Sequence, residues 1–258
     1  MIFRPGEMTR EEFPCEIVRR LPGGFMAEVY LARLQNTGHF MVVKGVPQKA
    51  PASFKEALKS EAAILKKIRL ETIPEIYGYF EDKEKRYFIM SYHVGDNLEE
   101  LLSKGSIPEK QIKGIALDVC KTLAYLHKKG MIYSDLKPSN MIWSKERVIL
   151  LDFGAALFSE EIGPHICFQG TVGYAAPEWF RDSNRKITYL ADVFSLGATL
   201  YRLLEGQEPK AHYGKFLLTD EQKKNRWQSI LDRCCAPETE NRYRSMAHIY
   251  DVINKIQI

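Results

Sequence analysis

Alternating hydrophobic and polar residues along the first third of the chain predict a β-sheet. Runs rich in β-branched and aromatic residues, separated by turns with Gly or Pro, are typical of strands. One segment, 53–68, has a helical period instead, and Ser53 is placed to cap it. The pattern predicts this helix and strands at 15–21, 28–34, 40–46, 76–80 and 86–92.

From about residue 94 onward the apolar residues recur at helical spacing. The turn 94–97 marks the change and predicts a hinge. Gly130 ends the first long periodic segment, as glycine often does just past a helix. The segment 189–204 is apolar nearly all round, which predicts a core helix. The helices expected here span 108–129, 189–204, 221–235 and 245–256.

This order predicts an α+β fold with two lobes. A small β lobe with one helix would occupy 15–93, and a larger, mainly helical lobe would occupy 94–258. Residues 1–14 are expected to be an N-terminal extension. A chain of 258 residues is long enough for such a pair of lobes.

Composition narrows the class of protein only a little. The chain is 45% hydrophobic and 27% charged, which is ordinary for a globular enzyme, and its net charge of +4 gives no argument for nucleic-acid binding. The five cysteines are scattered, with no spacing typical of a zinc site or disulfide framework, so a reducing compartment is favoured. No signal peptide or membrane span is indicated, and a cytoplasmic location is expected.

The segment Tyr133–Asn140, YSDLKPSN, is the most informative stretch, together with the DFG tripeptide at 152–154. Asp135 can orient a hydroxyl and accept its proton, and Lys137 can neutralise charge on a transferring phosphoryl group. Asn140 and Asp152 offer oxygen ligands to Mg²⁺, which binds few carboxylates and leaves room for substrate phosphates. Taken alone, Asp135 or Asn140 would be read as part of a polar turn. Their joint spacing with Asp152 favours phosphoryl transfer.

Two features of the expected β lobe have both a plain and a functional interpretation. The Gly-rich loop 22–27 could cradle phosphates with its N–H groups, although two glycines between strands more often form a simple hairpin turn. Lys44 ends an apolar strand and could merely reach solvent, and Glu61 could be part of a solvated helix face. As a pair, Lys44 and Glu61 predict an ion pair that holds the lysine against the α- and β-phosphates.

The chain resembles a eukaryotic-like (Hanks-type) serine/threonine protein kinase, over nearly its whole length from about Cys15. The small-residue loop running into 28–33 resembles bacterial members. The motifs occur in the order of that family. They are the loop before Val29, then Lys44, Glu61, Asp135, Lys137, Asn140, Asp152–Gly154, Ala176–Glu178, Asp192 and Arg242.

The resemblance implies the two-lobed protein-kinase fold, with an antiparallel sheet in the small lobe, and assigns roles to individual residues. Lys137 is the serine/threonine pattern, Thr171 would bond the Asp135 and Lys137 side chains, and Lys44, Asp135 and Lys137 would be catalytic. Asn140 and Asp152 would bind the metal. Glu178 would pair with Arg242, and Asp192 would anchor the catalytic-loop backbone. The residues implied to bind the nucleotide are Leu21, Gly23, Gly24, Val29, Val42, Lys44, Glu61, Met90, Ser91, His93 and Ile142.

The sequence departs from the family pattern in four places. Pro22 and Ala27 stand where the first and third loop glycines are usual, and proline lacks the N–H that could bind phosphate. Val42 replaces a smaller residue and crowds the adenine. Tyr133-Ser134 replaces His-Arg, and serine cannot pair with an activation-loop phosphate as arginine does. Little chain separates residue 204 from 221, so one helix of the large lobe is expected to be short or missing.

These observations predict an ATP-dependent protein kinase that uses Mg²⁺, with Mn²⁺ as an alternative metal, and acts on Ser/Thr hydroxyls of protein substrates. Two other classes stay open. A pseudokinase would bind nucleotide or act as a scaffold without turnover, and a small-molecule phosphotransferase would lack the segments 170–174 and 176–178. The chain ends where a kinase domain is expected to end, so a further sensor or membrane anchor stays open, as do the substrate, the pathway and the oligomeric state.

Overall fold

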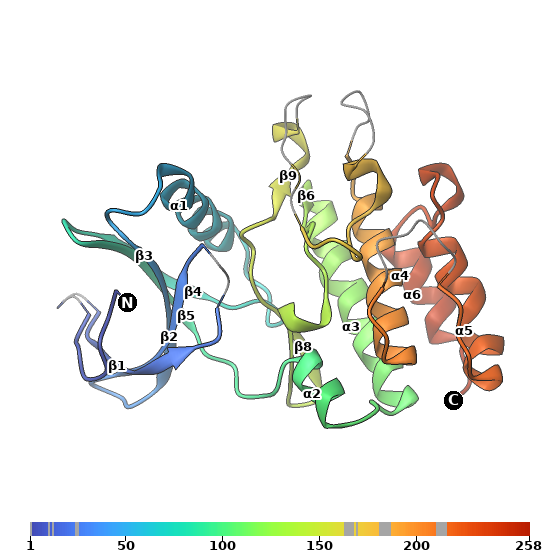
Figure 1. The fold of residues 1–258 in the computed structure, drawn as a ribbon, viewed down its shortest axis with the longest axis horizontal. Helices are drawn as coiled ribbons and strands as arrows, with labels where there is room; N and C mark the ends of the chain where they lie inside the picture. Colours follow the sequence, from blue (N-terminus) through green and yellow to red (C-terminus); the bar gives the residue numbers. More distant parts are fainter. Residues whose placement is uncertain are drawn as a thin grey trace. The chain divides into compact units, whose positions relative to one another are not determined.

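The structure is a computed structural model that describes residues 2–9, 11, 13–23, 26–162, 168, 170–180, 187–209 and 216–258. The chain divides into two compact units, Met1–Val94 and Gly95–Ile258 (Figure 1). The first unit contains a five-stranded antiparallel sheet and one helix, and the second is mainly helical. This composition agrees with the α+β fold that the sequence predicts, with one unit built on a sheet and the other mainly helical.

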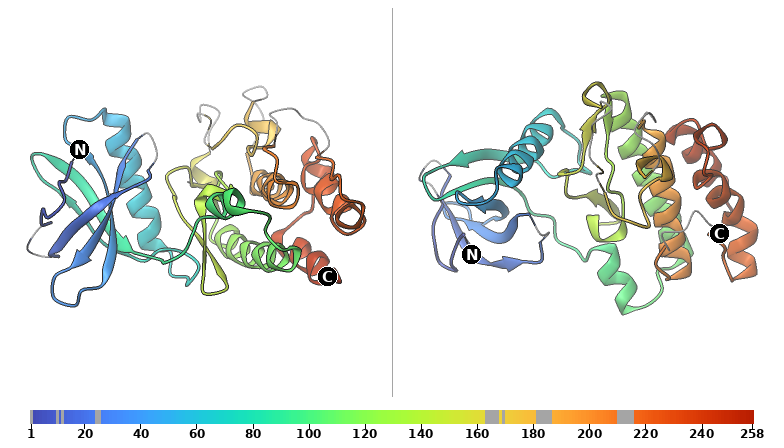
Figure 2. Two further views of the ribbon diagram at one scale, coloured as in Figure 1. Left: turned by 60° about the horizontal axis from the view of Figure 1, so that its bottom comes forward. Right: turned by 45° about the horizontal axis from the view of Figure 1, so that its top comes forward.

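The sheet of the first unit has the strand order β1-β2-β3-β5-β4. All five predicted strands are present, with ends within one residue of the predictions. Helix α1, Ala52–Lys67, packs against one face of the sheet (Figure 2). The strands are β1 (Cys15–Leu21), β2 (Glu28–Leu34), β3 (Phe40–Pro47), β4 (Ile76–Glu81) and β5 (Lys85–Ser91).

The predicted cap of α1 is wrong. The helix begins at Ala52, Pro51 occupies the N-cap position, and no side chain caps the helix. Proline fixes a backbone angle that suits a helix start, so the chain turns into the helix two residues earlier than a Ser53 cap would allow.

The opposite face of the sheet is covered by the N-terminal segment, residues 2–9. Phe3 is 1% exposed and packs edge-on against Tyr30 and Tyr87, with ring centroids 5.7 and 5.2 Å away. The backbone of the same segment pairs with β1, because Gly6 N–H donates to Ile17 O and Ile17 N–H donates to Glu7 O, at 2.8 and 2.9 Å. The segment therefore belongs to the folded first unit and supplies part of its core.

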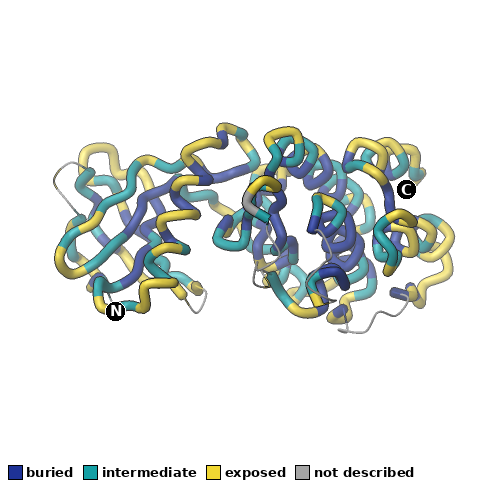
Figure 3. The backbone as a smooth tube through the Cα atoms, turned by 90° about the horizontal axis from the view of Figure 1, so that it is seen from above, coloured by how far each residue is buried: buried dark blue, intermediate teal, exposed yellow. Residues whose placement is uncertain are grey.

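The second unit is built around α3 and α4, which carry more buried residues than any other helix of the unit (Figure 3). Gly130 ends α3 with φ +72°, as its position after the periodic segment predicts. The four predicted helices are confirmed within two residues at each end. The helices are α2 (Leu98–Lys104), α3 (Glu109–Lys128), α4 (Leu190–Glu205), α5 (Glu221–Cys234) and α6 (Met246–Asn254).

Helix α2 was not predicted, although the sequence contains its signature. Asn97 accepts a hydrogen bond from Glu100 N–H, and the Glu100 side chain accepts one from Asn97 N–H, which is a reciprocal capping box. Two short ladders were also missed. They pair β6 (Met131–Ile132) with β9 (Leu157–Phe158), and β7 (Met141–Ser144) with β8 (Arg147–Leu150).

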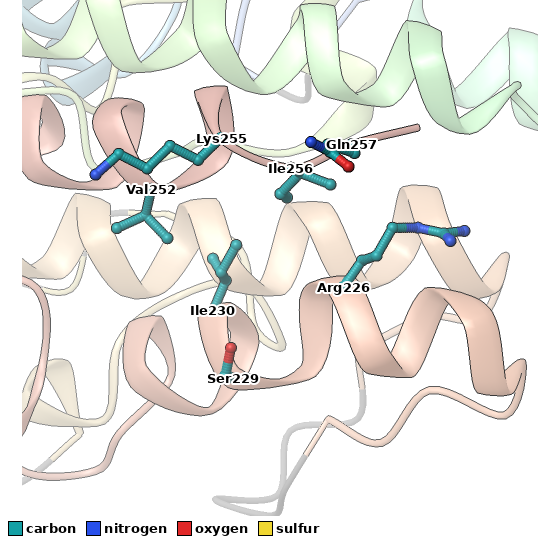
Figure 4. Close-up of a pocket in the computed structure, with 7 residues that line it drawn as sticks. All are labelled: Arg226, Ser229, Ile230, Val252, Lys255, Ile256 and Gln257. Atoms are coloured by element: carbon teal, nitrogen blue, oxygen red, sulfur yellow. The ribbon is translucent and has the colours of Figure 1, made fainter.

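A hollow of about 430 Å³ lies between α5 and the end of α6 (Figure 4). It contains none of the predicted site residues. Its lining consists of Arg226, Ser229, Ile230, Val252, Lys255, Ile256 and Gln257. Within the described ranges, every helix is too short or too polar to cross a membrane.

Candidate active site

Five predicted nucleotide-binding side chains share one face of the sheet in the first unit. Val29 on β2 lies opposite Leu21 on β1 and Lys44 on β3, and Val42 lies opposite Met90 on β5. Directly opposed residues of antiparallel strands point to the same side, and Val42 and Lys44 are two positions apart on one strand. The strand register therefore places an apolar surface beside Lys44. A nucleotide site needs both features, an apolar surface for the aromatic base and a cation for the phosphates.

The predicted ion pair on this face is present. Lys44 Nζ lies 2.7 Å from Glu61 Oε1, and the two side chains are 12% and 4% exposed. Helix α1 lies on the same face of the sheet and carries Glu61 toward β3. A buried lysine requires such a counter-charge, so the pair fixes where the ammonium group lies.

The structure describes the Gly-rich loop 22–27 in part and the end of β5 completely. Gly23 lies close to Val29, because a Cβ added to Gly23 would lie 3.1 Å from Val29 Cγ2, whereas Gly24 is outside the described residues. Ser91 N–H donates to Glu75 O at 2.8 Å, so any adenine contact at Ser91 falls to its carbonyl oxygen. The Ser91 hydroxyl lies 3.0 Å from His93 Nε2.

Asp135, in the second unit, is surrounded by donors. Thr171 Oγ1–H donates to its Oδ1 at 2.6 Å, and Lys137 Nζ and Asn140 Nδ2 lie 2.8 and 2.9 Å from its Oδ2. Lys137 also donates to Thr171 Oγ1 at 2.5 Å. The predicted contacts of Thr171 with both side chains are therefore present. They hold the carboxylate in one orientation.

The amide of Asn140 is oriented in a way that suits a metal site. Its Nδ2 donates to both Asp135 O and Asp135 Oδ2, at 2.9 Å each. Because those acceptors require the nitrogen, the amide oxygen is turned away from Asp135. A carboxamide oxygen is a ligand that Mg²⁺ accepts. Ile142, two residues along on β7, forms an isolated bridge with Asn97.

Asp152 lies just beyond β8 in a left-handed backbone conformation, with φ +49°. Its Oδ1 accepts a hydrogen bond from Gly154 N–H at 3.2 Å, and the residue is exposed. A non-glycine residue with positive φ is uncommon and is often found at a functional site. Among the described residues no group of three or more His, Cys, Asp or Glu could hold a metal. Mg²⁺ commonly uses one or two protein carboxylates plus phosphates, so this oxygen set fits it.

Side chains of α4 hold the loop that carries Asp135. Both oxygens of Asp192 accept backbone bonds, from Ser134 N–H at 2.8 Å and Tyr133 N–H at 2.9 Å. His127 Nε2 lies 2.8 Å from the same carboxylate, and Thr199 Oγ1 donates to Leu136 O at 3.2 Å. The anchoring role expected for Asp192 is confirmed. The contributions of His127 and Thr199 were missed, because their sequence positions carry no sign of a contact so far along the chain.

The expected ion pair between Glu178 and Arg242 is also present. Two parallel bonds of 2.7 and 2.8 Å join the carboxylate to the guanidinium, which is fully buried. Arg242 donates further to Ala236 O and Leu190 O, each at 2.8 Å. Planar paired bonds of this kind specify geometry as well as charge. The pair therefore ties the chain after Thr171 to the C-terminal helices.

Ser134, which replaces the usual arginine, is 2% exposed and has φ +69°. Its hydroxyl has no hydrogen-bond partner within the described part of the chain. Tyr133 is fully buried and meets Phe153 edge-on at 5.1 Å between ring centroids. The ring of Tyr133 therefore packs on Phe153, and the residue before Asp135 presents no cation.

These features define the protein-kinase class of fold. A sheet with one helix is followed by a helical unit, and a loop of that unit carries an acid, a lysine and an asparagine. The sequence pattern described as "Protein kinase domain" matches residues 15–256. The chain belongs to the protein kinase family, and its resemblance to Hanks-type serine/threonine kinases is confirmed.

Relatives from several kingdoms are similar over most of this chain. "Calcium/calmodulin-dependent protein kinase type 1" of Caenorhabditis elegans is 28% identical over 80% of the chain, which covers 59% of that protein. "Serine/threonine-protein kinase PknG" of Mycobacterium leprae is 28% identical over 93% of the chain, covering 32% of that protein. "Serine/threonine-protein kinase RUNKEL" of Arabidopsis thaliana is 32% identical over 72%, covering 14%. The chain thus spans less than two thirds of the length of each.

Proposed function

We propose that this protein is an active kinase that transfers the γ-phosphoryl group of Mg-ATP to Ser or Thr hydroxyls of proteins. The observation that carries the proposal is the hydrogen-bonded set of Asp135, Lys137, Asn140 and Thr171. All four side chains are in contact within one site. A pseudokinase that only binds its ligand does not need three donors to orient the Asp135 carboxylate, because that carboxylate would take part in no reaction.

The proposed chemistry assigns one task to each side chain. Asp135 orients the substrate hydroxyl and accepts its proton as the new O–P bond forms, while the bond from the γ-phosphorus to the bridging oxygen breaks and ADP leaves. Lys137 stabilises negative charge on the transferring group, and Lys44, held by Glu61, binds the α- and β-phosphates. Asn140 and Asp152 would hold Mg²⁺, which neutralises phosphate charge when bound; Mn²⁺ offers the same octahedral oxygen chemistry.

The pseudokinase remains the second candidate, and one observation favours it. Pro22 and Ala27 flank a loop that can offer fewer N–H groups to phosphates than a loop with three glycines. The Asp135 set argues more strongly for turnover, because all of its members are present and correctly paired.

Substrate class and location follow from weaker observations. Thr171 beside Asp135 and Lys137 supports a protein hydroxyl as acceptor, since this segment is the one that seats the substrate in the family. Free thiols at Cys15, Cys120, Cys234 and Cys235 support a reducing compartment such as the cytoplasm. Burial raises the pKa of the Cys15 thiol to about 11 and that of Cys234 to about 12, so these thiols are unreactive.

The test is an assay with γ-labelled ATP, a generic basic protein and, in parallel, a panel of small alcohols. We expect label on Ser and Thr of the protein and none on the alcohols. ATP binding by calorimetry without any transfer would establish the pseudokinase instead. Label on an alcohol alone would establish a small-molecule phosphotransferase.

A further inference from the structure

The N-terminal segment, residues 2–9, reaches the end of the Gly-rich loop. Ile2 N–H donates to Glu28 Oε2 at 2.7 Å, and the Tyr30 hydroxyl donates to the same oxygen at 2.6 Å. Ile2 N–H also lies 3.1 Å from the Tyr30 hydroxyl oxygen. Glu28 is the first residue of β2 and directly follows the loop 22–27. The segment is therefore bonded to the strand at the point where the loop ends.

The other oxygen of Glu28 faces the opposite end of the loop. Glu28 Oε1 lies 3.6 Å from Arg20 Nη2, and Arg20 stands on β1 two residues before Pro22. Burial acts to raise the pKa of Glu28, but hydrogen bonds from the Tyr30 hydroxyl and Ile2 N–H keep that pKa below its ordinary value. A charged carboxylate thus joins both ends of the loop to the N-terminal segment.

The same segment also touches β3 beside Lys44. A Cβ added to Gly45 would lie 2.7 Å from Ile2 Cδ1, so the absence of a side chain at Gly45 leaves room for the isoleucine. Glu28 and Gly45 are directly opposed, as are Val29 and Lys44, and neighbouring positions on a strand point to opposite faces. The segment therefore lies behind the two strands whose other face carries the predicted nucleotide-binding side chains.

Lys85 on β5 holds the segment in this position. Its ammonium donates to Ile2 O at 3.2 Å, pairs with Glu7 Oε1, and lies 3.8 Å from the centroid of the Phe3 ring. An ammonium group over an aromatic face is attracted to the ring, so all three contacts favour the bound segment. In the sheet, β3 stands between β5 and β2. We therefore expect Lys85 to influence the loop through the segment.

We propose that residues 2–9 position the Gly-rich loop for binding the phosphates of ATP, and that Glu28 is the positioning residue that connects the two. The inference rests on the function proposed above and adds the element that fixes the loop. Glu28 contacts neither nucleotide nor substrate in this scheme; it acts through the N–H groups of the loop. A segment that only completed the core would instead affect the binding of every ligand of this unit alike.

Glu28→Gln keeps the length of the side chain but cannot keep all of its contacts. Both oxygens of Glu28 face donors, so a carboxamide must turn its NH2 group toward Arg20 or toward Ile2 N–H. Affinity for ATP should fall about three- to tenfold, because a loop that is held less closely pays more to order its N–H groups. Affinity for adenosine should not change, since adenosine has no phosphate.

The measurement is calorimetric titration with ATP and with adenosine, each in Mg²⁺. Lys85→Met keeps the aliphatic stem but removes the ammonium, and it should show the same selective loss for ATP. The double variant should lose little more than either single variant, because both act through one segment. Glu16→Gln is the matched control, since Glu16 pairs with Arg33 at 2.9 Å across the same two strands. It should match the parent for both ligands.

Three results would overturn the inference. They are an unchanged affinity for ATP in either folded variant, an equal loss for ATP and adenosine, and a fully additive loss in the double variant. Should Glu28→Gln fail to fold, Lys85→Met decides by the same comparison of ligands.

A parent protein that binds no ATP would instead contradict the proposed function. Hydrogen exchange over residues 21–29 then tests the inference separately, because it needs no ligand. Faster exchange in Glu28→Gln and Lys85→Met than in Glu16→Gln supports the role of the segment. Equal exchange in all three variants overturns it.

Discussion

The two units hold their reactive groups in different ways. In the first unit the functional side chains stand on regular strands, and the register alone brings Val29, Val42 and Lys44 to one face. An ion pair to Glu61 then helps to fix the lysine. In the second unit the reactive groups stand on irregular loops. Asp135 is held by three side chains, and its loop backbone is held by Asp192.

The difference shows how the conformation of a segment determines what must hold it. A strand has its direction set by its ladder, so a side chain on it needs few further contacts. A loop has no ladder, and the positive φ at Ser134 and Asp152 adds a conformational free-energy cost. Each of these positions must therefore be fixed by hydrogen bonds from other segments of the chain. We therefore expect single substitutions to act mainly through charge in the first unit, and mainly through contacts in the second.

The largest effect on activity is expected at Asp135. Asp135→Asn keeps the shape of the side chain, with its oxygen toward Lys137 and its nitrogen toward Thr171, but removes the proton acceptor. Turnover should fall between roughly 10²- and 10⁴-fold with little change in ATP binding. Steady-state kinetics and calorimetry measure the two. Asp251→Asn on the exposed side of α6 is the control. Near-normal turnover would remove Asp135 from its role.

Loss of Phe3 should weaken the first unit alone. Phe3→Ala removes a ring that is 1% exposed and lies under the ammonium of Lys85, 3.8 Å from Nζ. Emptying a site of this size costs about 3 kcal/mol. Hydrogen exchange should quicken at β1 and β2 and stay unchanged at α3. Phe40→Ala, at a ring that is 48% exposed, should have little effect. Equal quickening in both units would contradict the comparison.

A smaller effect is expected at Glu61. Glu61→Gln keeps the length of the side chain but leaves the Lys44 ammonium without its counter-charge. We expect kcat/KM to fall about tenfold, mostly through KM for ATP, because the lysine is no longer held against the phosphates. Glu56→Gln, an exposed position on the same helix, should behave as the parent. An unchanged KM would show that Lys44 is placed by the strand alone.

The smallest effect is expected at Ser159, the only hydroxyl-bearing residue between Ala155 and Gly170. The residue immediately before Asp135 is Ser134 and not an arginine, and Glu160 would repel a phosphate. Dephosphorylated protein and Ser159→Ala should show full activity without a lag, matching protein preincubated with ATP. A lag removed only by phosphorylation at Ser159 would contradict this. In that case the next substitution would be at Lys129, as the cation that receives the phosphate. Lys129 precedes Gly130, whose carbonyl oxygen accepts a hydrogen bond from Ser159 N–H.

Much of this fold could be predicted because its elements repeat locally. Strand and helix periods located ten of the longer elements to within two residues at each end, and Asn97 with Glu100 would have located α2 as well. The identities of Lys44, Glu61, Asp135, Asn140 and Asp152 were also readable, since their order along the chain matches the protein kinase family. These properties depend on residue type and short spacings, which a sequence displays directly.

Other properties required the tertiary structure, because they depend on contacts between residues far apart in the chain. Phe3 reads as part of a polar extension, yet it is a core residue, since the face it covers exists only once β2 and β5 share a sheet. His127 acquires its role only when Asp192 arrives beside it, 65 residues later. The sequence by itself identified the groups that we propose perform the chemistry. The packing decided which other groups hold them in place.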